Sequence, residues 1–74
     1  MRARSRTHLN FGKRIKELRS KRGMTQEALA DAIGVDRSYM GFVERGERNP
    51  TLDKIARIAK ALKVSLSTLF EDVK

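Results

Sequence analysis

A group of polar side chains leads a short helical segment in the middle of the chain, where residues 35–48 read VDRSYMGFVERGER. Arg37, Ser38 and Tyr39 lie together at its front. Arginine can bind guanine O6 and N7 with two hydrogen bonds, and serine can contact several base edges. Gly41 follows one turn later, where it costs about 1 kcal/mol relative to alanine, and its missing side chain would let the helix approach a groove closely. The segment predicts a helix that reads bases. Alternatively, Arg37 and Ser38 could be solvated first-turn residues, and Tyr39 could pack on a neighbouring helix.

The residue types on which most enzymes depend are scarce. The chain has one histidine, His8, and no cysteine, and it contains neither a glycine-rich phosphate loop nor paired carboxylates in a plausible cleft. We therefore predict no enzymatic activity, no metal site and no cofactor. We expect no small-molecule effector, because no effector domain follows. No apolar run approaches the roughly 18 residues of a membrane span, so we expect a cytoplasmic protein without membrane contact.

The positive charge is concentrated at one end of the chain. Residues 1–22 contain nine Lys or Arg and one acid, a net +8, whereas residues 23–74 contain eight of each and sum to zero. Such an asymmetry indicates a polyanionic partner, for which double-stranded DNA is the favoured hypothesis and a soluble basic surface the alternative. Arg2, Arg4 and Arg6 could form an arm that binds phosphates or a minor groove. The basic residues of the first helix, Lys13, Arg14 and Lys16, are expected to be a solvated face.

Apolar residues recur at helical spacing throughout, which predicts an all-α domain of five short helices. Phe11, Ile15 and Leu18 form the inward face of the first helix. The expected N-caps of the other four are Thr25, Asp36, Thr51 and Ser65, with Gly23 and Gly34 ending the first two helices. The inward stripe of the fourth helix is expected to be Leu52, Ile55, Ala59 and Leu62. Residues 1–8 are predicted to be a flexible basic tail, and residues 9–74 a single domain.

The second and third helices are joined by only three residues, Gly34-Val35-Asp36. Two helices joined by so short a turn must cross steeply, as they do in a helix-turn-helix unit. Small residues, Ala30 and Gly34, lie where the two helices come close. The third helix would then be the one presented to the DNA major groove, which admits a single helix.

Several features occur together in residues 23–70, which include TQEALADAIGVDRSYMGFVERGERNPTLDKIARIAKALKVSLSTLF. They are Gly23, Thr25-Gln26-Glu27, Ala30, Gly34, the ERG of residues 44–46, Asn49-Pro50-Thr51-Leu52, Ala61-Leu62 and Val64-Ser65. From about Phe11 to Phe70 the chain resembles the Cro/repressor type of helix-turn-helix protein, often called the XRE family. Within that family DRSYMGFVERGERN is most similar to the small controller proteins of restriction–modification systems. Phage repressors and antitoxins share the same framework.

The resemblance implies a lambda-repressor-like DNA-binding domain and assigns further residues. Gln26, with Thr25 beside it, matches the family position that binds backbone phosphate and braces the reading helix, although Gln26 could also be a simple exposed polar residue. In the loop after the third helix, the controller proteins imply a base contact for Arg48 and a phosphate contact for Asn49. Alternatively, the loop makes no DNA contact and uses Gly46, Asn49 and Pro50 only for the backbone geometry of a turn.

The family also often pairs an arginine late in the first helix with a glutamate late in the third. Arg19 and Glu44 stand at those positions. We expect them to orient the reading helix, although a weak surface ion pair is the alternative.

The last helix predicts self-association. Leu66 and Leu69 are expected to face inward, which leaves Phe70 and Val73 as a patch for a second copy of the chain. A homodimer would present two reading helices to an inverted-repeat operator. The favoured hypothesis is a transcriptional regulator, and the rival is a protein-interaction module of the same fold, such as an antitoxin or a phage-type repressor component. The sequence leaves open the operator sequence, whether the protein activates or represses, and which genes it controls. It also leaves open whether the context is restriction–modification, a phage or an antitoxin.

Overall fold

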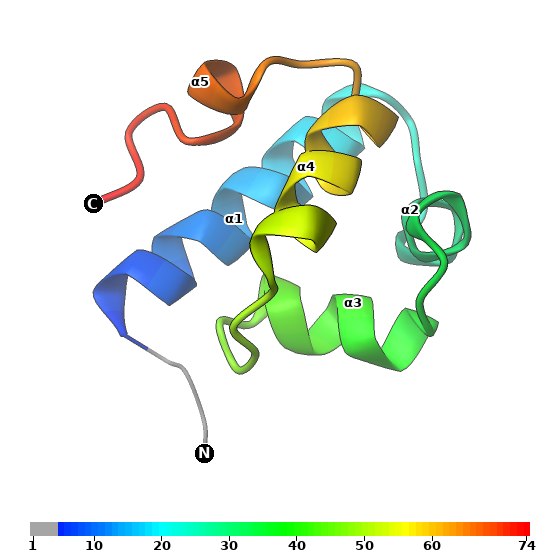
Figure 1. Ribbon diagram of the computed structural model, residues 1–74, viewed down its shortest axis with the longest axis horizontal. Coiled ribbons are helices and arrows are strands. Elements are labelled where there is room, and N and C mark those ends of the chain that lie inside the picture. The colour runs from blue at the N-terminus through cyan, green and yellow to red at the C-terminus, as the bar shows by residue number, and fades with distance from the viewer. Residues whose placement is uncertain (1–4) are drawn as a thin grey trace.

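The computed structural model describes residues 5–74, and within them the regular structure is entirely helical. The five helices are α1 (Arg6–Lys21), α2 (Gln26–Ile33), α3 (Arg37–Glu44), α4 (Leu52–Ala61) and α5 (Leu66–Leu69) (Figure 1). The predicted all-α, five-helix fold is confirmed. Figure 1 shows α3 along the lower edge of the molecule and α5 at the upper edge, with the C-terminus at the left.

Local hydrogen bonds explain where four of the helices begin. Thr25 Oγ1 accepts from the backbone N–H of Ala28 at 3.0 Å, and Thr51 and Ser65 cap α4 and α5 in the same way. Asp36 occupies the N-cap of α3, but within the described chain its carboxylate accepts no capping hydrogen bond. The first N–H groups of α3 are therefore not covered by that side chain.

The first helix starts earlier than the sequence indicated. Ser5 is its N-cap, and its hydroxyl accepts from the His8 N–H at 3.1 Å. This bond starts α1 at Arg6, so the part of the predicted tail from Arg6 to His8 is helical. Arg2 and Arg4 lie outside the described residues.

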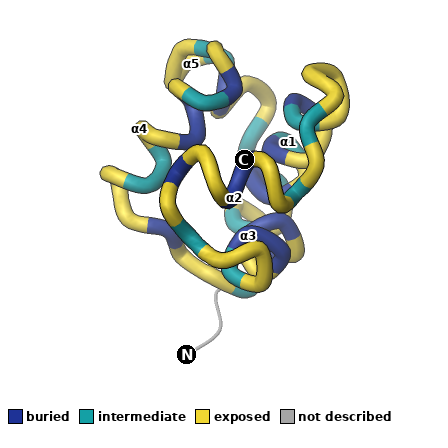
Figure 2. Tube along the Cα trace, turned by 90° about the vertical axis from the view of Figure 1, so that its right-hand side faces the viewer, coloured by how far each residue is buried: buried dark blue, intermediate teal, exposed yellow. Residues whose placement is uncertain are grey.

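One buried cluster unites all five helices. Its members are Phe11, Ile15, Leu18, Leu29, Ala30, Ile33, Met40, Val43, Ile58, Ala59, Leu62 and Leu69. In Figure 2 buried and exposed stretches alternate along the chain, as expected for amphipathic helices that pack by one side.

Two leucines that were expected in the core are exposed. Leu52 is 73% exposed and Leu66 is 45% exposed. Each is the first residue of its helix, so its side chain lies beyond the turns that pack on neighbouring helices. The inward expectation is right for Leu69, which is fully buried.

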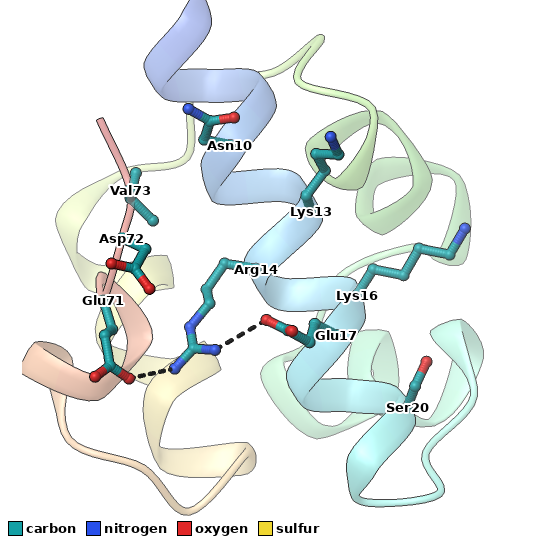
Figure 3. Close-up of a pocket in the computed structure, with 9 residues that line it drawn as sticks. All are labelled: Asn10, Lys13, Arg14, Lys16, Glu17, Ser20, Glu71, Asp72 and Val73. Carbon is teal, nitrogen blue, oxygen red and sulfur yellow. Dashed lines mark hydrogen bonds and ion pairs between the residues drawn. The ribbon is translucent and has the colours of Figure 1, made fainter.

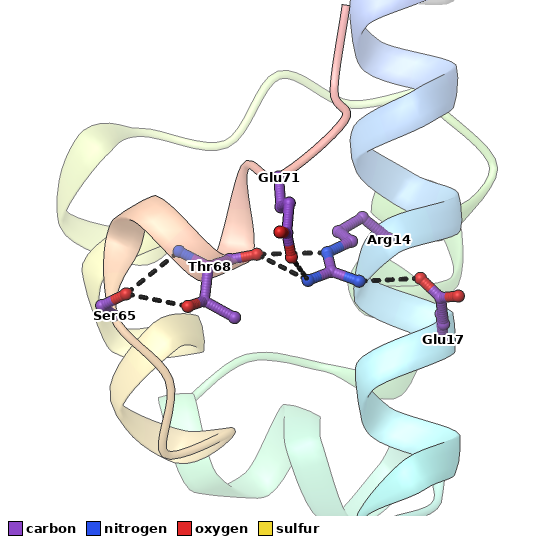
Figure 4. Close-up of polar contacts among 5 residues, drawn as sticks. All are labelled: Arg14, Glu17, Ser65, Thr68 and Glu71. Carbon is purple, nitrogen blue, oxygen red and sulfur yellow. Dashed lines mark hydrogen bonds and ion pairs between the residues drawn. The ribbon is translucent and has the colours of Figure 1, made fainter.

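Arg14 belongs to the tertiary structure and not to a solvated basic face. Its guanidinium donates to the Thr68 carbonyl oxygen from Nε at 3.1 Å and from Nη2 at 2.8 Å, and it also pairs with Glu17 and Glu71 (Figure 4). Only 13% of the Arg14 side chain is exposed. Figure 3 shows Arg14 directed at the C-terminal segment. This arginine thus attaches α5 to α1.

Glycine is required where α1 crosses the end of α3. A Cβ atom added to Gly12 would overlap the Glu44 carbonyl oxygen and lie 2.6 Å from the Val43 carbonyl oxygen. Both neighbours are backbone atoms, which cannot move aside as a flexible side chain can. This role of Gly12 was not predicted from the sequence, although a glycine inside a helical pattern can indicate a packing constraint.

Candidate nucleic-acid interface

The turn between α2 and α3 sets the direction of the predicted reading helix. Gly34 has φ = 76°, the left-handed conformation that glycine adopts without strain. The Val35 N–H then donates to the Ala30 carbonyl oxygen at 3.0 Å, which closes the end of α2. Figure 1 shows α2 nearly end-on and α3 side-on, so the two helices cross steeply. This is the arrangement that the three-residue connection predicted.

A shallow hollow joins the start of α2 to the outer side of α3. It is lined by Gln26, Arg37, Ser38, Gly41, Phe42 and Arg45, of which none is acidic. Arg37 and Ser38 are exposed at the front of α3. The structure therefore brings two predicted base-contacting residues and one predicted phosphate-contacting residue to one surface. Guanidinium, hydroxyl and amide groups at this surface are suited to phosphate oxygens and base edges.

Gly41 has a different surrounding from the one expected. It is buried, and a Cβ added there would lie 3.2 Å from Arg45 Nη1 and 3.6 Å from Gln26 Oε1. The absent side chain thus makes room for Gln26 and Arg45, which lie over this part of α3. The glycine still serves the outer surface of the helix, but through these two side chains and not by leaving the backbone open.

Glu44 is the centre of a polar network behind this surface. Its carboxylate accepts from Arg19 Nε at 2.7 Å, from Arg19 Nη2 at 3.1 Å and from Gln26 Nε2 at 3.0 Å. The glutamate side chain is only 3% exposed and that of Arg19 only 13% exposed. Arg19 also donates to the Met24 carbonyl oxygen at 2.8 Å. The network holds α1, α3 and the start of α2 together. The bond from Gln26 to Glu44 is a physical means for the bracing of the reading helix that the resemblance implied.

Cationic and aromatic side chains gather along the neighbouring side of α3. Tyr39 and Phe42 are one turn apart, with the Arg48 guanidinium over both rings and Lys54 Nζ 5.5 Å from the Tyr39 ring centre. Tyr39 is half-buried; burial raises the pKa of its phenol, and the positive charge of Arg48 partly opposes that rise. The hydroxyl accordingly remains a neutral donor at physiological pH.

Sequence reasoning overlooked Phe42, Arg45 and Lys54. Phe42 and Arg45 follow Tyr39 at successive i, i+3 spacings. This spacing was a usable signal for both residues, because side chains so spaced share one side of a helix. Lys54 lies on α4, so only the packing of α4 brings it to Tyr39.

The remaining predicted contacts lie at the margins. Thr25 is exposed and caps α2, so its hydroxyl stands at the N-terminal end of that helix. Asn49 is exposed in the loop after α3 and precedes the buried Pro50. In the part of the chain that the structure describes, no helix is long and apolar enough to cross a bilayer. The same residues contain no metal-binding group of three or more His, Cys, Asp or Glu side chains.

The family model described as Helix-turn-helix matches residues 15–69, most of the chain. The chain belongs to this helix-turn-helix family. The control protein C.MunI of Mycoplasma sp is 38% identical over 66 residues, which are 88% of this chain and 89% of the relative. The control protein C.BamHI of Bacillus amyloliquefaciens is 42% identical over 64 residues, covering 85% of this chain and 79% of the relative.

The fold of the chain is also similar to that of a solved structure. The restriction–modification controller protein C.AhdI from Aeromonas hydrophila superposes with a TM-score of 0.81 and 48% identity, over 84% of this chain and 94% of that one. The predicted resemblance to Cro/repressor-type proteins, and among them to restriction–modification controllers, is confirmed.

Proposed function

We propose that the protein is a sequence-specific transcriptional regulator that binds an inverted-repeat operator as a homodimer, in the manner of a restriction–modification controller. The observation that carries this proposal is the hollow in which Gln26 of α2 meets Arg37 and Ser38 of α3. Membership of the helix-turn-helix family and similarity to control proteins support it. The cytoplasmic location predicted from the sequence follows from this role.

The proposal divides the contacts between bases and backbone. Arg37 and Ser38, at the front of α3, contact base edges in the major groove. Gln26 contacts a phosphate, as do Thr25 at the start of α2 and Asn49 after α3. The N-terminal end of α2 supplies free N–H groups and a favourable dipole for the same phosphate. Arg48 contacts a base, and the Tyr39 ring lies against the Arg48 guanidinium.

The homodimer rests on the surface of α5. Phe70 is 39% exposed, and Leu66, one turn before it, is 45% exposed. Val73 follows three residues after Phe70; it is half-buried and packs against the core. A second copy of the chain would cover Leu66 and Phe70 about a two-fold axis. Its α3 would then meet a second half-site about 34–36 Å along the same side of the DNA.

Selection of bound sites from a random pool of duplex DNA tests the function directly. We expect an inverted repeat whose half-sites are about one helical turn apart. Arg37→Ala should weaken binding to that site by about 1–3 kcal/mol and relax the preference at one base pair. Gln26→Ala should weaken binding to all sequences alike. Arg57→Ala, at an exposed residue of α4, is the matched control for loss of a positive charge.

Two results would contradict the proposal. A selected motif unchanged by Arg37→Ala would show that α3 does not read bases through this arginine. A pool that yields no preferred sequence at any salt concentration would reject sequence-specific binding altogether.

A further inference from the structure

The guanidinium group of Arg48 lies against two aromatic rings of α3. Its central carbon is 5.7 Å from the centre of the Phe42 ring and 6.0 Å from the centre of the Tyr39 ring. Arg48 comes from the loop after α3, whereas both rings come from the helix itself. The contact therefore fixes a loop side chain relative to the helix that carries Arg37 and Ser38.

The position of Phe42 is unusual for a residue with only a structural purpose. It is 37% exposed and is not part of the buried core. It lines the same hollow as Arg37 and Ser38, and the Arg45 guanidinium also lies over its ring, 5.0 Å from the centre. A large apolar ring kept at the surface among arginines is placed to hold those cations.

The chemistry of stacking leaves Arg48 able to read a base. A cation–π contact engages the flat face of the guanidinium, whereas the N–H donors point outward in its plane. The stacked side chain has lost much of its rotational freedom before it meets DNA, which reduces the entropy cost of binding. The same edge can then bind guanine O6 and N7 or enter a narrow minor groove.

We propose that Phe42, supported by Tyr39, is a positioning residue that holds Arg48 ready for a base contact beside the one made by Arg37. This inference rests on the proposed function, and it adds a specificity determinant that touches the arginine and not the DNA. Arg45, the C-cap of α3, lies over the same ring and also pairs with Glu47 at 3.5 Å.

The test compares two variants: Phe42→Leu removes the aromatic ring, and Phe42→Tyr keeps it. Binding is measured on the selected operator and on operators changed at single base pairs, in the wild type, in both variants and in Arg48→Ala. Phe42→Leu should reduce discrimination about two- to fivefold at the base pair that Arg48→Ala relaxes, the range expected for an exposed cation–π contact. Discrimination at the Arg37 base pair and the slope of affinity against salt should not change. Phe42→Tyr should retain wild-type discrimination.

The double variant Phe42→Leu, Arg48→Ala separates positioning from direct contact. If the ring acts through Arg48, Phe42→Leu has no further effect once Arg48 is absent. An equal loss in that background would mean that the ring itself touches DNA, for example a thymine methyl group, and would overturn the inference. So would an unchanged preference in Phe42→Leu alone. A wild-type protein without any sequence preference would reject the proposed function as well.

The free protein offers a readout that does not depend on DNA. Protons on the Arg48 side chain should show ring-current shifts in nuclear magnetic resonance spectra. Phe42→Leu should reduce these shifts, and Phe42→Tyr should preserve them. Identical Arg48 shifts in wild type and Phe42→Leu would show that the ring does not hold the guanidinium in solution.

Discussion

At the residue scale, Glu44 connects the stability of the domain to its proposed DNA surface. Its carboxylate accepts three hydrogen bonds, two from Arg19 and one from Gln26, in a site that is almost closed to solvent. A buried ion pair is not by itself a large source of stability, because both charges lose their hydration. Its consequence is geometric: Gln26 is held in place by a residue of α3.

Glu44→Ala should lower the free energy of unfolding by about 3–5 kcal/mol, because Arg19 would retain a largely buried charge without its carboxylate counter-charge. Thermal and denaturant unfolding measure this change. Arg19→Met combined with Glu44→Leu should recover much of the loss, since neither charge then remains. A coupling energy near zero in this double-mutant cycle would indicate two independent charges, contrary to the network described above.

At the element scale, the crossing of α1 and α3 depends on Gly12. The backbone of α1 approaches the Val43 and Glu44 carbonyl groups so closely that any side chain would separate the helices. This crossing also carries the Arg19–Glu44 pair. The orientation of the proposed reading helix is therefore set by a residue on another helix.

Gly12→Ala should destabilise the domain by about 1–3 kcal/mol or more, the usual cost of overpacking. The direction is informative, because alanine is the better helix former by about 1 kcal/mol and would stabilise an unconstrained helix. Ser20→Ala, at an exposed position of the same helix, is the control and should be neutral or slightly stabilising. A Gly12→Ala variant that melts above the wild type would mean that the two helices are not in close contact.

At the scale of the whole molecule, the basic residues of α1 and of its C-cap, Arg22, have two different roles. Arg14 and Arg19 donate to α5 and α3, and Arg22 Nε donates to the Leu62 carbonyl oxygen at the end of α4 at 2.7 Å. These side chains hold the helices together. Lys13 and Lys16 are exposed and remain available to a polyanion. The excess charge of the N-terminal part thus serves both the fold and the surface.

Replacement of Leu66, in α5, or of Phe70, just after it, should give a monomer. Leu66→Glu is the cleaner variant, because the Phe70 ring stacks on Phe11 with its centre 4.8 Å away, so Phe70→Glu also removes a contact within the chain. Sedimentation at micromolar concentration should show wild-type dimers and Leu66→Glu monomers. Operator affinity should fall about a hundredfold when two linked half-site contacts become independent.

Ser20→Glu adds the same charge to an exposed site on α1 and should leave the dimer intact. A wild-type protein that is monomeric both free and on its preferred site would contradict the two-fold assembly. Circular dichroism of each variant distinguishes loss of association from loss of folding.

Features governed by neighbours in sequence were predictable from the sequence. The capping hydroxyls of Thr25, Thr51 and Ser65 bond to backbone N–H groups three residues on. The turn at Gly34 and the steep pair of helices around it depend on a few consecutive residues. The Arg19–Glu44 pair joins two helices that are distant in sequence, and it was predicted only through the family resemblance.

Features that depend on distant segments were decided by the tertiary structure alone. Arg14 bonds to Thr68 across 54 positions of sequence, so nothing near Arg14 distinguishes it from its solvated neighbours. Leu52 and Leu66 fit the apolar rhythm of their helices, yet their positions at the helix starts leave them exposed. Periodicity identifies which side of a helix is apolar, but only the packing of other helices determines how much of that side is covered.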